Sequence, residues 1–141
     1  MSKINCILSL AFLSFISCNS TPEPIINNTG VSLDLAQYRA EQISNVIYDL
    51  SFYIPAQKEQ PIASKLKLTT TITDLTNPLY LDFKEDSKNL QYLLVNQQII
   101  DIQHELEHLI IPQEYLVLGQ NQITIDFIAG DLSLNRNDDY L

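Results

Sequence analysis

The strongest constraint on the fold is a repeated alternation of apolar and polar side chains. The segment 62–72 places its large apolar residues on one face of a strand and its lysine and most of its threonine residues on the other. The segments 46–54, 79–83 and 123–127 show the same period, and 90–95 is a more apolar run that ends at an Asn-Gln pair. This period is typical of antiparallel strands with one buried face. The sequence therefore predicts an all-β fold, an antiparallel sheet or sandwich, with turns at Asn96-Gln97 and at 119–121.

One short helix is expected before these strands. Leu35, Tyr38 and Gln42 recur at helical spacing, and Ser32 or Asp34 could cap the amino end of the helix. We expect this helix near residues 34–42. The chain of 141 residues is the size of a single domain.

The amino-terminal residues indicate export rather than folding. A short apolar run, 7–16, follows Lys3 and ends at Phe15-Ile16-Ser17-Cys18, which is similar to the lipobox of bacterial lipoproteins. We therefore expect a lipoprotein signal peptide at 1–17, a lipidated Cys18 that opens a polar tether at 18–32, and a β-domain at 33–141. An ordinary secretory signal or an anchoring helix is the alternative. The expected location is extracytoplasmic, in a bacterial cell envelope, with membrane lipid as a partner.

Cysteine content and charge limit the disulfides and the partners that this chain can have. Cys6 and Cys18 are the two cysteines, so the expected exported domain can form no internal disulfide. The formal net charge is −9, which repels nucleic-acid phosphates, and we expect no nucleic-acid partner. Glu85 and Asp86 lie beside Lys84 and Lys88, a pattern typical of a solvated turn.

The segment His104-Glu-Leu-Glu-His108 matches the H-E-x-x-H signature of zinc peptidases. In that signature two histidines share one face of a helix, and the glutamate activates the metal-bound water. This alternative makes His104 and His108 the zinc ligands and Glu105 the base. The chain would then be a minimal zinc peptidase.

The surrounding pattern favours a structural role for both histidines. Apolar residues alternate from Ile100 to Ile110 as in a single strand, where residues four apart lie about 13 Å from each other. A helix stays open as an alternative, because other apolar residues of 99–110 form a stripe at helical spacing. Catalytic zinc needs a third protein ligand, and no glutamate follows Glu114. We therefore expect two half-buried strand histidines, and no catalytic or metal-binding residue.

Four segments carry a resemblance to a known family. They are 43–55, Pro78-Leu-Tyr-Leu-Asp-Phe83, His108-Leu-Ile-Ile-Pro112, and 119–141 with its Asn135-Arg-Asn-Asp-Asp139 loop. In this order they resemble the first domain of zinc aminopeptidases of the aminopeptidase N type, over roughly residues 33–141. The resemblance implies a saddle-shaped β-domain that is incomplete here. It also implies that the catalytic domain, which holds the zinc, is absent from this chain, and it aligns the 108–112 segment with a strand of the first domain.

The family's substrate-binding motif, Gly-x-Met-Glu-Asn, is missing, since the one methionine is Met1. The resemblance therefore implies a non-catalytic domain, or a truncated fragment, of a membrane-anchored zinc aminopeptidase. Such a domain forms a wall of the peptide-binding cleft. Its expected partners are a separately encoded catalytic domain or peptides, and its own chain carries no cofactor. The alternative from another class is a free-standing extracytoplasmic lipoprotein that binds a ligand through a β-sandwich.

Overall fold

The computed structural model describes residues 28–130. The signal peptide expected at 1–17, the lipidated Cys18 and the 135–139 loop lie outside these residues. Among the residues described, no helix is both long and apolar enough to cross a membrane.

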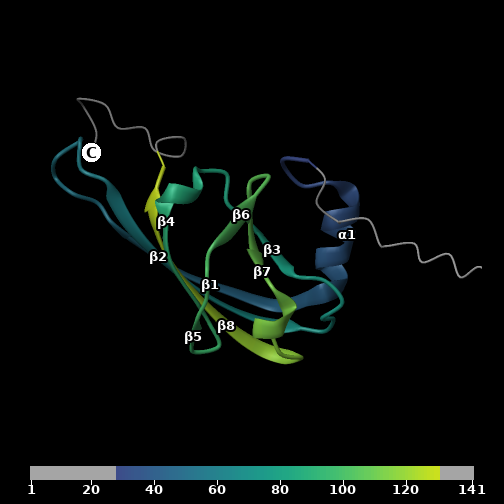
Figure 1. The fold of residues 1–141 in the computed structure, drawn as a ribbon. Helices are drawn as coiled ribbons and strands as arrows, with labels where there is room; N and C mark the ends of the chain where they lie inside the picture. Colours follow the sequence, from purple (N-terminus) through teal and green to yellow (C-terminus); the bar gives the residue numbers. More distant parts are fainter. Residues whose placement is uncertain (1–27, 131–141) are drawn as a thin grey trace, which may run out of the picture.

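The chain forms one helix and two antiparallel sheets (Figure 1). The larger sheet has the strand order β1-β2-β8-β4-β5 and the smaller one has the order β3-β7-β6. The predicted all-β class with one amino-terminal helix is therefore confirmed. The elements are α1 Leu33–Gln42, β1 Ile43–Tyr53, β2 Ile62–Ile72, β3 Leu79–Asp82, β4 Leu90–Val95, β5 Gln98–Ile99, β6 Gln103–Glu105, β7 His108–Ile111 and β8 Gly119–Ala129, with 3-10 turns at Ser87–Asn89 and Gln113–Tyr115.

The helix begins where the sequence predicts it. The Ser32 hydroxyl accepts a hydrogen bond from the backbone N–H of Leu35 at 3.1 Å, so Ser32, and not Asp34, is the N-cap. Leu35 and Gln42 are the buried residues of α1, and the chain passes directly from Gln42 into β1. The helix thus fixes the start of β1 at one end of the larger sheet (Figure 1).

The larger sheet is built on three long strands. β2 pairs with β1 on one side, and on the other side it pairs with β8 over its whole length, from Ile62 opposite Ala129 to Ile72 opposite Gly119. The apolar face predicted for 62–72 is the buried one, which confirms the register expected from the alternation. β8 already begins at Gly119, so the prediction of a turn at 119–121 is wrong.

Both sheets contribute to one core. The larger sheet curves around the smaller one, so that the concave face of the first meets the inner face of the second (Figure 1). The buried apolar residues form a single cluster: Leu68, Ile72, Leu79, Leu90, Leu93, Val95, Ile100, Leu109, Ile111, Leu116, Ile123 and Ile125. Burial of this apolar surface is the main force that holds the two sheets together.

The single strand predicted for 100–110 is wrong. The chain instead makes a hairpin in which Glu105 pairs with His108 across a two-residue turn. Leu106 and Glu107 both have positive φ, at 49° and 68°, as in the tight turns that match the twist of a hairpin. The turn predicted at Asn96-Gln97 is confirmed, with φ of 48° and 71°. Asn favours this backbone, whereas Leu106-Glu107 gives no such signal in the sequence.

The apolar face predicted for β1 is not buried. Tyr48, Leu50 and Phe52 point to the concave side of the sheet, yet 61%, 47% and 50% of each residue is exposed. β1 is an edge strand of the larger sheet, and its concave side lines an open cavity. Asn45, with φ of 51°, lies in a bulge that shifts the register between Ser44 and Ile47. The alternation therefore predicted the strand correctly and its burial wrongly.

Candidate functional site

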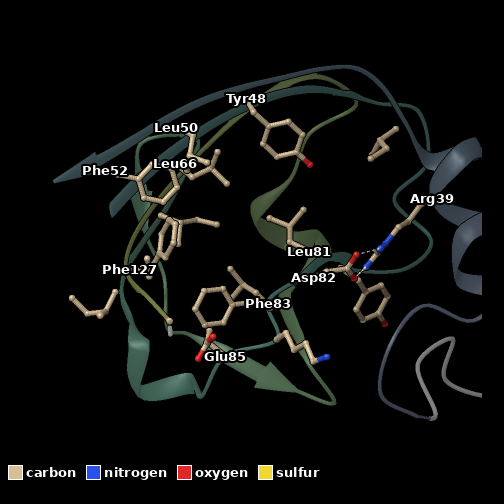
Figure 2. Close-up of a pocket in the computed structure, with 18 residues that line it drawn as sticks. Arg39, Tyr48, Leu50, Phe52, Leu66, Leu81, Asp82, Phe83, Glu85 and Phe127 are labelled. Atoms are coloured by element: carbon tan, nitrogen blue, oxygen red, sulfur yellow. Dashed lines mark hydrogen bonds and ion pairs between the residues drawn. The ribbon is translucent and has the colours of Figure 1, made fainter. Parts of the chain in front are cut away.

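The strongest candidate site is a cavity of about 520 Å³ between the two sheets. Figure 2 shows Tyr48, Leu50 and Phe52 on one wall and Leu81 and Phe83 facing them. The lining is mainly apolar, and charged side chains lie at its rim: Arg39, Asp82, Lys84 and Glu85. A concave apolar surface with a few polar groups is the usual form of a binding site for a small molecule or a peptide.

Aromatic rings give the inner end of this cavity its shape. The ring of Phe127, on β8, makes edge contacts with Phe52 at 6.5 Å and with Phe83 at 5.9 Å between centroids. Such edge-to-face pairs hold rings in fixed orientations. Phe52 and Phe127 lie on the larger sheet and Phe83 directly follows β3, so the three rings join the two walls.

An ion pair closes the other end, beside α1. Two Arg39 nitrogens donate to the two carboxylate oxygens of Asp82, at 2.9 and 2.6 Å. His108 lies behind this pair, with Nδ1 at 3.0 Å from Asp82 Oδ1 and Nε2 at 3.0 Å from the carbonyl oxygen of Gly30. The cluster therefore joins the helix, the smaller sheet and the segment before the helix.

The cluster holds the Asp82 carboxylate in its charged form. Hydrogen bonds from Arg39 lower the pKa of Asp82 most, and the charges of Arg39 and His108 lower it further, against the opposite effect of burial. The Asp82 side chain is still 54% exposed, so solvent screens these interactions.

This geometry predicts a specific acid dependence. Because the folded pKa of Asp82 lies below the unfolded value of about 3.9, its stabilising contribution is present above about pH 4 and is lost as the pH falls through the folded value. We expect Asp82→Asn to be less stable than the natural chain at pH 6, by up to about 1 kcal/mol. The difference should shrink toward pH 2. Urea titrations at both pH values test this, and a difference that does not depend on pH would contradict it.

Glu85 lies at the opposite end of the cavity, where the sequence predicts a solvated turn. Glu85 is half-buried, and its carboxyl group packs against Gly130, so closely that a Cβ at Gly130 would overlap it. Within residues 28–130, Glu85 makes no ion pair and no hydrogen bond through its side chain. The expectation of a solvated turn is therefore wrong for Glu85, although Asp86 and Lys88 do form an exposed ion pair at 3.3 Å.

The two histidines of the H-E-x-x-H segment occupy a hairpin and not a helix. His104 pairs with Leu109 and His108 pairs with Glu105, so the two rings point to opposite faces of the smaller sheet. His104 Nε2 lies 2.7 Å from the carbonyl oxygen of Phe83. In residues 28–130, no group of three or more His, Cys, Asp or Glu side chains is arranged to hold a metal ion.

The burial expected for these histidines is correct for one of them. His104 is half-buried on β6, as predicted, whereas His108 on β7 is 1% exposed. His108 lies on the outer face of the smaller sheet and is covered by Arg39 and Gly30. Its two ring nitrogens both have partners within the chain, which gives it a structural role between α1 and β7.

Two buried amides, those of Asn121 and Gln42, hold loops of the fold and were not predicted. The Asn121 side chain accepts from the N–H of Val117 at 2.9 Å and donates to the carbonyls of Val117 and Gly119 at 2.7 and 2.9 Å. It also accepts from the Asn96 amide at 2.7 Å. Gln42 donates to the carbonyl of Asn77 at 3.1 Å. Buried polar groups that are bonded in this way fix loops to sheets.

Comparison with protein-family models, with curated proteins and with solved structures found no match. The resemblance to aminopeptidases therefore rests on the sequence motifs alone.

Proposed function

We propose that this chain is a non-catalytic first domain, or a truncated fragment, of a membrane-anchored zinc aminopeptidase of the aminopeptidase N type. In this proposal it forms one wall of the peptide-binding cleft. The observation that carries the proposal is the apolar cavity, which lies open along β1. An exposed apolar surface of this kind marks a site of interaction, because soluble monomers rarely leave one uncovered.

The positions of the two histidines support a non-catalytic domain. Zinc catalysis by an H-E-x-x-H segment requires both rings to converge on one ion and a third ligand beside them. His104 and His108 point to opposite faces of a hairpin instead, and both are bonded to groups of the fold. In the proposed enzyme, zinc belongs to the catalytic domain and not to this one.

The reading frame downstream of this gene tests the proposal. We expect it to encode a helical H-E-x-x-H segment, a later glutamate ligand and a Gly-x-Met-Glu-Asn motif. Co-expression of the two products should then yield a complex that co-purifies and releases amino-terminal residues. An unrelated downstream gene would contradict the proposal.

That outcome would favour a second function, a free-standing extracytoplasmic lipoprotein that binds its ligand in the same cavity. The observation in its favour is that residues of both sheets of this chain already line the cavity. Ligand binding would then need no catalytic partner.

Both proposals include a lipid anchor at Cys18. We expect the full chain to fractionate with membranes and Cys18→Ser to move to the soluble fraction, because several acyl chains make detachment rare. Cys6→Ser is the matched control and should stay membrane-bound as the natural chain does. Equal partitioning of the natural chain and Cys18→Ser would contradict the anchor.

A further inference from the structure

β1 has the properties of a strand that accepts another strand. It is eleven residues long and lies at the edge of the larger sheet, so among residues 28–130 only β2 pairs with it. Edge strands are usually protected by charges, proline or short length. Here the one charged residue of β1 is Asp49, and the strand contains no proline. Its outer row of backbone N–H and C=O groups is therefore open to pairing.

The same edge opens into the apolar cavity. Tyr48, Leu50 and Phe52 lie on every second residue of β1 and project into the cavity (Figure 2). A strand added beside β1 would place its own alternate side chains next to these three. Main-chain bonds to the edge and pockets for alternate side chains are the two elements of peptide recognition by strand addition.

The charges select among possible occupants. Glu85 lies at the Phe52 end of the cavity, because it packs on Gly130 just beyond the end of β8, and Phe127 of β8 is level with Phe52. Its carboxylate has no ionic partner within the described part of the chain. A basic side chain would pair with it. A second copy of this chain is disfavoured, since each copy carries a net charge of −9.

We propose that β1 binds an extended peptide by strand addition, with alternate apolar side chains of the peptide in the cavity and a basic side chain at Glu85. An alkyl ligand would fill the cavity but leave the edge groups of β1 unpaired. The inference goes beyond the proposed aminopeptidase role, because strand addition needs neither zinc nor a catalytic part. The two can therefore fail separately.

Fluorescence anisotropy with three labelled peptides tests the inference on the full chain. The first peptide is as long as β1, alternates valine with threonine and ends in lysine. The second has the same composition with its valines in one block, and the third is the first peptide with alternate backbone nitrogens methylated. We expect saturable binding of the first alone. Equal binding of the first two, or binding of the methylated peptide, would overturn strand addition.

A pair of tyrosines on β1 provides the matched variants. Tyr48 is opposite the buried Leu68 and faces the cavity, whereas Tyr53 is opposite the exposed Ala63 and faces away. We expect Tyr48→Ser to weaken binding about tenfold, as for an aromatic anchor, and Tyr53→Ser to leave it unchanged. Glu85→Gln should weaken the lysine peptide and not a version with threonine in its place. Melting curves confirm that each variant is folded.

Equal effects of the two tyrosine variants on peptide binding would contradict the proposal that the peptide contacts the cavity face of β1. Sedimentation of the chain without peptide tests the competing occupant. We expect a monomer. A dimer that Tyr48→Ser dissociates would show that a second copy pairs with β1, and this would overturn the proposal that β1 binds a peptide.

Discussion

Replacing Leu109 by alanine is expected to lower the free energy of unfolding by about 2–5 kcal/mol. Leu109 is 1% exposed and lies on β7, where it pairs with Leu81 and His104 and faces the common core. The substitution would leave a hole between the two sheets, and the strands on either side cannot close it without moving. Urea denaturation followed by circular dichroism measures the change.

The matched control is Leu118→Ala, because Leu118 is 66% exposed. It should change the free energy of unfolding by less than about 0.5 kcal/mol. Similar losses in the two variants would contradict the assignment of the core to the space between the sheets.

Replacing Asn121 by alanine is expected to cost about 2–4 kcal/mol of unfolding free energy. The side chain is fully buried, and its removal would leave the N–H of Val117 without its acceptor. The Asn96 amide would lose one of its two acceptors and keep the Tyr115 carbonyl. The loop from Val117 to Gly119 would also lose its attachment to β8. The effect differs from that of Leu109, because it arises from unpaired polar groups and not from a hole.

The matched control is Gln120→Ala, because Gln120 lies next to Asn121 on β8 but is exposed. It should be close to neutral in the same denaturation experiment. A loss from Asn121→Ala no greater than that from Gln120→Ala would contradict the role of the buried network.

Local patterns predicted most elements of this fold, and tertiary contacts decided the burial of these elements. The period of two identified β2 together with its buried face, because β2 lies inside the sheet with strands on both sides. The same alternation in β1 also predicts a buried face. However, β1 lies at an edge, and within residues 28–130 its apolar side chains line an open cavity and stay exposed. The sequence of β1 contains no sign of this difference.

The hairpin at 103–111 shows a different failure. Its apolar residues continue the alternation through the turn, so the sequence around Leu106-Glu107 resembles an uninterrupted strand. The cluster of Arg39, Asp82 and His108 was also missed. Arg39 and Asp82 are 43 residues apart and meet only because α1 lies against the smaller sheet. No rule on sequence spacing predicts that such distant residues are in contact.

One assay on the full chain tests whether this domain is non-catalytic. The purified protein is supplied with zinc and with aminoacyl nitroanilides, and release of nitroaniline is followed over time. We predict no zinc-dependent release, because His104 and His108 point to opposite faces of the smaller sheet. Zinc-dependent release that Glu105→Gln abolishes, and that the neighbouring exposed substitution Gln103→Glu leaves intact, would contradict the non-catalytic role.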